Sequence, residues 1–249
     1  APAAQAGVNA ALDNPARYLV SGQSQASGNR TQAEIATLAL VRLAFTDAAF
    51  VAGQLVDRWQ ARLPADLSAW AWARTGRHAA SELLTEAAGY YRHAWSEADR
   101  SGQPPQWSDD TLAWGVRAAL RGSAGSERWN AVLRSTDVMG EAEQRDPAWR
   151  YWSAHGLRET AAPAAAGDKQ RGRGTAHLSL LADELHFYGK LAAEDLGRVF
   201  TVPARPDPLT AAELEAARGH PGLTRALQLI GLGLRNEGVR EWNFSLRGM

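Results

Sequence analysis

The sequence of 249 residues contains no cysteine. This absence excludes disulfides, zinc–thiolate sites and thiol nucleophiles, and it is compatible with any compartment, including an oxidising one. The chain also has no net charge, because 27 lysine and arginine residues balance 27 aspartate and glutamate residues. No overall field therefore draws nucleic acid or an anionic membrane to the protein, which leaves such contacts to local patches. We expect no nucleic-acid partner and no membrane span.

Long apolar runs are missing as well, since none approaches the ~20 residues that a membrane span needs. The chain begins with APAAQAG, so it shows neither an initiating Met nor a secretory signal, and we interpret it as a mature product or an excerpt of a longer protein. Sequence signatures of catalysis are also absent, including G-x-S-x-G, a glycine-rich phosphate loop and H-E-x-x-H. We assign no catalytic residue and no cofactor.

The apolar residues of the sequence recur mainly with the period of an α-helix. Alanine is abundant, tryptophan (ten) outnumbers phenylalanine and tyrosine (five each), and no segment alternates with the period of a strand. Helix starts are predicted at Ser108, at Pro147 and at two capping boxes, Thr31-x-x-Glu34 and Thr210-x-x-Glu213. Four tryptophans lie on apolar stripes and are expected in the core, namely Trp70, Trp95, Trp129 and Trp242.

The helices recur in pairs at irregular intervals of roughly 30–40 residues, as in helical repeat arrays. Such pairs bury their apolar faces only by stacking, so the sequence predicts an all-α superhelical array of antiparallel helix pairs. The proline-rich segment TVPARPDP, residues 201–208, reads as a semi-rigid connector. We therefore expect a superhelical domain over residues 1–200 and a small helical linker domain over residues 201–249.

The segment AAPAAAGDKQRGRG, Ala161 to Gly174, interrupts the helical pattern. It is expected to form a mobile, solvated loop, or else a basic flap that contacts an anionic or sugar ligand through Lys169, Arg171 and Arg173. Trp107, beside two prolines, is less periodic than the other tryptophans and is a candidate for an exposed indole that stacks on a sugar. These four side chains are the candidate substrate contacts.

Candidate metal ligands are sparse. His93 with Glu97, and His155 with Glu159, are spaced to share one helix face, but two ligands without further candidates make a weak site. We interpret both as surface pairs and predict no metal site.

Glycine follows two aromatic residues in the stretch HFYGKLAAEDLG, His186 to Gly197. Glycine inside a helix costs about 1 kcal/mol relative to alanine, so its presence indicates a point where two helices approach closely. On this hypothesis Gly189→Leu destabilises the fold, whereas Gly189→Ala is milder and even favourable if the backbone accepts a Cβ. The alternative is that Gly189 faces solvent on an ordinary helix, in which case both substitutions are neutral or stabilising.

Four segments in order resemble the helical part of soluble lytic transglycosylases. They are WRYWSAHGL (Trp149 to Leu157), HFYGKLAAEDLG (His186 to Gly197), HPGLTRALQLIGLGLRNEG (His220 to Gly238) and EWNFSLRGM (Glu241 to Met249). The resemblance extends from Arg62 to the end of the chain. It departs from the family's pattern in the Ala161–Gly174 segment and at His155, where the family tends to carry Arg.

The resemblance implies a superhelical domain that forms much of a ring, in a periplasmic enzyme made with a signal peptide. It also implies that the enzyme cleaves the peptidoglycan glycan strand to anhydro ends, with a catalytic glutamate in a Glu-Ser motif of a lysozyme-like domain. This chain contains no Glu-Ser dipeptide, so no catalytic residue is carried over. We interpret it as the non-catalytic superhelical and linker portion, with the glycan strand and cell-wall proteins as expected partners.

Two other hypotheses stay open. One is a free-standing helical-repeat scaffold that binds a protein or peptide in its groove. The other is a complete enzyme with an unrecognised site. The reading frame beyond Met249 distinguishes the first interpretation from the scaffold.

Overall fold

A computed structural model describes residues 2–21, 29–199, 205 and 207–247, and every regular element in these ranges is helical. The chain divides into two compact units, Ala1–Phe200 and Thr201–Met249. The predicted all-α class is therefore confirmed. No helix in the described ranges is long and apolar enough to cross a membrane.

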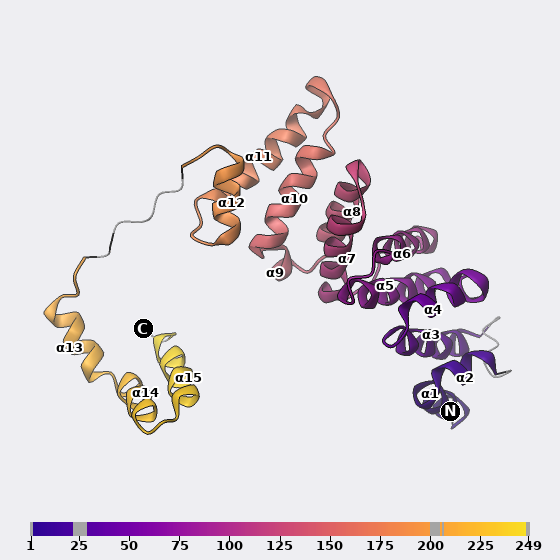
Figure 1. Ribbon diagram of the computed structural model, residues 1–249, viewed down its shortest axis with the longest axis horizontal. Helices are drawn as coiled ribbons and strands as arrows, with labels where there is room; N and C mark the ends of the chain where they lie inside the picture. Colours follow the sequence, from indigo (N-terminus) through magenta and orange to yellow (C-terminus); the bar gives the residue numbers. More distant parts are fainter. Residues whose placement is uncertain (1, 22–28, 200–204, 206, 248–249) are drawn as a thin grey trace. The chain divides into compact units, whose positions relative to one another are not determined.

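The first unit is a superhelical array in which helices that are consecutive in the sequence pack side by side (Figure 1). The main pairs are α5 with α6, α7 with α8, and α10 with α11, and the pairs are joined by contacts of α5 with α7 and of α8 with α10. Its helices are α1 (Pro2–Asp13), α2 (Pro15–Val20), α3 (Arg30–Ala44), α4 (Ala48–Gln54), the π-helix η2 (Leu55–Trp59), α5 (Ala65–Ser81), α6 (Ala87–Ser101), α7 (Asp109–Gly122), α8 (Gly125–Asp137), α9 (Glu141–Gln144), α10 (Pro147–Glu159), the 3₁₀ turn η3 (Ala164–Gly167), α11 (Asp168–Ala182) and α12 (Phe187–Asp195).

The core alternates alanine with a few very large side chains. Trp59 and Trp72 are almost completely buried among alanines of α3, α5, α6 and α7. Of the four tryptophans expected in the core, Trp95 is buried as predicted, whereas Trp70 and Trp129 are only partly buried. Alanine faces let helices approach closely, and the indoles fill the space that remains between them.

Tyr91 shows this packing in detail, because its ring lies between glycines of two other helices. A Cβ atom at Gly76 of α5 would lie 2.9 Å from the ring, and one at Gly115 of α7 would lie 3.1 Å from it. The phenol donates a 2.6 Å hydrogen bond to the carbonyl of Thr111, and burial raises the pKa of Tyr91. Three helices thus meet at one fully partnered aromatic side chain.

Helix starts follow the sequence signals with one exception. The Ser108 hydroxyl accepts from the amide of Thr111, Pro147 begins α10, and the Thr210 box is complete. The box predicted at Thr31 is wrong. Asn29 caps α3 instead, two residues earlier, because its carboxamide oxygen accepts hydrogen bonds from the amides of Thr31 and Gln32.

The Ala161–Gly174 segment is not a loop, contrary to our expectation. Residues 164–167 form η3 and α11 begins at Asp168, where Arg171 donates to the carbonyl of Ala162 (2.7 Å) and pairs with Asp168 (2.5 Å). A Cβ atom at Gly174 would lie 2.6 Å from the carbonyl oxygen of Ala154. Gly174, one of the glycines that suggested a loop, instead lets α11 lie close against α10.

The second unit consists of α13 (Ala211–Gly219), α14 (Pro221–Gly231) and α15 (Arg235–Leu246). Leu223 and Ala226 are buried where α14 packs on α15, and Arg225 pairs with Glu241 at 2.6 Å. Trp242 is 36% exposed, so the prediction that it is a core residue is wrong. Three helices leave too little interior to enclose its indole. Most of the predicted connector, at 201–204 and 206, lies outside the described residues.

Gly189 lies in the first turn of α12, against the end of α11. Its amide donates a 3.0 Å hydrogen bond to Nδ1 of His186, which caps the helix. A Cβ atom here would lie 2.8 Å from the carbonyl oxygen of Leu181 and far inside van der Waals contact with that of Glu184. The close approach is therefore present, but the obstacle is backbone, and even alanine does not fit.

We expect Gly189→Ala and Gly189→Leu both to lower the free energy of unfolding, by about 1–3 kcal/mol or more, because a carbonyl cannot move aside as a side chain can. Gly172→Ala on the neighbouring helix α11 is the matched control, since nothing lies within 4 Å of its Cβ position. It should stabilise by about 0.4–1 kcal/mol. Urea titrations of the three variants check this, and an alanine variant at 189 that is as stable as wild type would contradict it.

Candidate functional site

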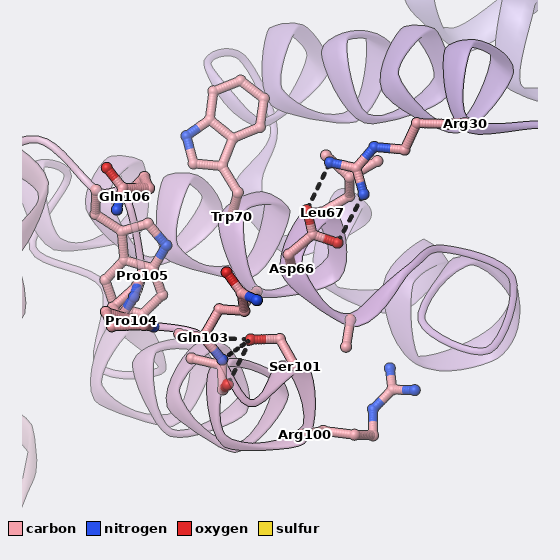
Figure 2. A pocket seen from close by; sticks show the side chains of 14 residues that line it. Arg30, Asp66, Leu67, Trp70, Arg100, Ser101, Gln103, Pro104, Pro105 and Gln106 are labelled. Carbon is pink, nitrogen blue, oxygen red and sulfur yellow. Dashed lines mark hydrogen bonds and ion pairs between the residues drawn. The ribbon is translucent and has the colours of Figure 1, made fainter.

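A surface cavity of the first unit, about 770 Å³, lies between the start of α5, the end of α6 and the connection to α7. We call it the α5–α6 groove (Figure 2). Arg30 of α3 borders it on one side and the segment from Gln103 to Trp107 on the other. Trp70 stands between these two sides.

The segment after α6 is held in place by backbone geometry and short hydrogen bonds. Gly102 ends the helix in the left-handed region (φ 67°), a conformation that glycine adopts without strain. The hydroxyl of Ser101 donates to the carbonyl of Ala98 at 2.7 Å and accepts from the amide of Gln103 at 3.2 Å. Two prolines then restrict the backbone before Ser108 caps α7. This wall of the groove is consequently pre-formed.

Trp107 lines the groove, but it is 9% exposed and not the open indole that we expected. Its ring centroid lies 4.5 Å from that of Trp95, which in turn lies under the guanidinium of Arg134 at 4.3 Å. Trp107 belongs to the connection between α6 and α7, and its ring packs against Trp95. Removing so large an apolar ring from water is favourable, so it is buried. The accessible indole of the groove is that of Trp70, whose position on an apolar stripe did not predict this role.

The charges at the groove are already paired within the protein. Arg30 binds Asp66 through two hydrogen bonds, 2.9 and 2.6 Å, which join α3 to the first turn of α5. These bonds hold the pKa of Asp66 below its usual value. Arg100 pairs with the buried Glu97, which also accepts a 3.1 Å bond from Gln60. Asp66 therefore remains ionised near neutral pH.

This arrangement favours binding over proton transfer. A glycosidase acid needs a carboxyl group whose pKa is raised, and the carboxyl group of Asp66 is shifted the other way. The groove instead combines the partly exposed indole of Trp70 with the exposed amides of Gln103 and Gln106 and two arginines at its rim. An apolar face beside amide donors and acceptors suits a ligand rich in hydroxyl groups.

The structure does not bring the four predicted contact residues together. Trp107 lines the α5–α6 groove, whereas Arg173 lines a separate cavity bounded by α8–α11. Arg171 is bound to Asp168 and to the carbonyl of Ala162, and Lys169 is exposed on the first turn of α11. Substrate contact by these residues stays a prediction.

Neither His/Glu pair is arranged as a metal site. His93 stacks on Trp72 with ring centroids 4.5 Å apart, and its neighbour Glu97 binds arginine and glutamine. Nε2 of His155 lies 2.8 Å from Asp195, which also accepts a 2.7 Å bond from the phenol of Tyr151. In the part of the chain that the structure describes, no three His, Asp or Glu side chains are grouped to hold a metal ion.

The fold and the groove define an all-α superhelical protein with a pre-formed surface groove and no recognisable catalytic centre within the described residues. No family model and no curated protein matches the sequence. Among solved structures, the chain is similar to an inactive mutant of the lytic transglycosylase Slt from Pseudomonas aeruginosa, with a TM-score of 0.62 and 23% identity. The match covers 98% of this chain and 37% of that chain, so the chain spans little more than a third of the length of that enzyme. The resemblance to lytic transglycosylases is supported at the level of the fold.

Trp107→Ala should lower the free energy of unfolding by about 3–5 kcal/mol, because it removes a buried ring and leaves a cavity beside Trp95. Trp70→Ala should cost clearly less, since part of its indole already contacts solvent. Chemical denaturation of both variants makes the comparison. Equal losses would contradict the assignment of Trp107 to the interior and of Trp70 to the groove.

Proposed function

We propose that this chain is the superhelical and linker portion of a soluble lytic transglycosylase, a scaffold that contacts the peptidoglycan glycan strand without cleaving it. The observation that carries the proposal is the shared fold with the Slt enzyme over 98% of the chain, at about a third of the length of that enzyme. The four sequence segments that resemble the family support it independently. The parent reaction is the non-hydrolytic cleavage of the glycan strand that leaves 1,6-anhydro-muramyl ends.

In this proposal the α5–α6 groove is the glycan contact. A sugar ring presents an apolar face of C–H groups and a periphery of hydroxyl groups. The indole of Trp70 matches the face, and the amides of Gln103 and Gln106 match the periphery. The two arginines that line the groove are each ion-paired with a carboxylate of the protein. Their charges are therefore already compensated, which suits an uncharged sugar as the ligand.

We also place the protein in the periplasm, where its glycan substrate lies. The absence of cysteine is compatible with that compartment and does not select it.

A second function, a helical-repeat scaffold for a protein partner, is favoured by one observation. The second unit carries exposed apolar side chains on α14 and α15, with Leu227 at 59% and Phe244 at 72% exposed. Exposed apolar clusters of this kind mark interaction surfaces in many proteins. A cell-wall protein is the expected partner class.

The purified chain should cosediment with insoluble peptidoglycan but clear none of it in a zymogram. Trp70→Ala should reduce the bound fraction several-fold, because stacking on the indole is lost. Trp242→Ala is the matched control, since it removes an exposed indole that does not line the groove, and it should leave binding unchanged.

Two results would oppose this proposal. A cleared zymogram band absent from mock purifications would show that the chain is itself an enzyme. Failure of the folded wild-type chain to cosediment would remove the glycan contact and favour the protein-partner function.

The native protein should be recovered in the periplasmic fraction of its cells and should be made with a signal peptide that precedes this sequence. Cell fractionation with a cytosolic enzyme as marker measures this. Recovery with the cytosolic marker alone would be incompatible with a role on the cell wall.

A further inference from the structure

A second cavity, about 660 Å³, lies between α8, α9, α10 and α11, and its lining residues do not include those of the α5–α6 groove. Its apolar wall includes Trp149 of α10, which is buried, and Leu180 of α11, which is 65% exposed at the rim. Six titratable side chains line the same cavity, namely Asp137, Glu141, Arg145, Arg150, Arg173 and His177. We call it the α8–α11 cavity.

Three of these six groups are already paired in the protein. Arg145 binds Glu141 at 3.3 Å, and Arg150 binds Glu184 of the α11–α12 connection at 2.7 Å. Their charges are compensated without a ligand. The uncompensated set is therefore Arg173 and His177, one turn apart on α11, together with Asp137 at the end of α8.

Arg173 and His177 line the same cavity from neighbouring turns of α11. Burial lowers the pKa of His177, and the nearby charges of Arg173 and Arg150 lower it further. The side chains of Arg173 and His177 form no hydrogen bond or ion pair within the described ranges. An anionic group placed here would meet unused N–H donors of the Arg173 guanidinium and of the neutral His177 imidazole.

Asp137 supplies the opposite charge in the same cavity. Both Asp137 and Arg173 line this cavity. Partial burial raises the pKa of Asp137, and the charge of Arg173 opposes that rise. No hydrogen bond joins them in the part of the chain that the structure describes. The cavity thus presents a carboxylate acceptor, a cationic guanidinium and a neutral imidazole N–H that line one cavity without being bonded to each other.

We propose that the α8–α11 cavity binds an amino-acid zwitterion, with its carboxylate on Arg173 and His177, its ammonium group on Asp137, and its aliphatic part against Trp149 and Leu180. A simple anion would leave Asp137 unpaired, and a simple cation would leave Arg173 unpaired. A ligand with both charges on one carbon compensates each of them. The apolar wall adds contact area for a short aliphatic chain.

A diamino acid of a peptidoglycan stem peptide carries such a zwitterion at the end of its side chain. This identification of the source rests on the proposed function, whereas the zwitterion site itself does not. A free amino acid has the same chemistry, and the choice between the two sources is made by experiment.

The test uses isothermal titration of the full chain with two tripeptides, L-Ala-γ-D-Glu-meso-diaminopimelate and L-Ala-γ-D-Glu-L-Lys. They differ in one side-chain carboxylate. We expect the diaminopimelate peptide to bind at least tenfold more tightly, and we expect Arg173→Gln to abolish that difference. Lys169→Gln is the matched control, because it removes the same charge from α11 at a position outside the cavity, and it should keep the preference.

Further measurements distinguish a free amino acid from a stem peptide as the ligand, and separate failure of this proposal from failure of the proposed function. Free meso-diaminopimelate binding as tightly as the tripeptide would assign a free amino acid as the ligand, and weaker binding assigns the stem peptide. Asp137→Asn should weaken both diaminopimelate ligands. Equal affinity of wild type for the two tripeptides, or an unchanged preference in folded Arg173→Gln, would overturn the proposal. Cosedimentation dependent on Trp70 would persist in that event, so the two proposals fail separately.

Discussion

The close approach of neighbouring helices, made possible by alanine and glycine, is the constraint on which the rest of this structure depends. Gly76 and Gly115 admit the ring of Tyr91 between α5 and α7, and Gly174 lets α11 lie against the backbone of α10. In a stacked array each helix contacts only its neighbours, so a displacement at one contact changes the position of every later helix pair. The interior is too densely packed for neighbouring side chains to compensate for such a displacement locally.

Tryptophan complements this small-residue packing in two ways. Trp59 and Trp72 fill interior space between alanine faces, whereas Trp70 lies at the edge of the core and exposes part of its ring to the groove. The same residue type therefore serves stability in one place and a candidate binding surface in the other. Helix spacing alone does not separate the two roles, because the partly exposed Trp70 lies on an apolar stripe of its helix just as the buried Trp95 does.

Arginine supplies most of the polar links between helices, and all but two of the 27 basic residues are arginines. The forked guanidinium of Arg30 binds both oxygens of Asp66, and Arg150 reaches Glu184 across to the next helix connection. Such bidentate geometry is not available to lysine. Because these arginines are paired, the one at the α8–α11 cavity without a bonded carboxylate, Arg173, stands apart as a group with unused donors.

The sequence by itself determined the helical class, three of the four predicted helix starts and the resemblance to lytic transglycosylases. These depend on local hydrogen bonding and on periodicity, as at Ser108 and Thr210, and a linear pattern records both. The sequence also located Gly189 as a close contact. It did not reveal that the contacting atoms are backbone carbonyls, which turns the expected mild effect of alanine into a clash.

Only the tertiary structure decided which side chains meet. The segment from Ala161 to Gly174 read as a loop because glycine weakens helices, yet Gly174 is required by the close packing of α11 on α10. The four predicted contact residues were chosen because basic and aromatic side chains suit an anionic or sugar ligand. The fold separates Trp107 from Arg173, because the two line different cavities of the array. Long-range contacts between segments 30 or more residues apart, such as Arg30 with Asp66, leave no periodic trace in the chain.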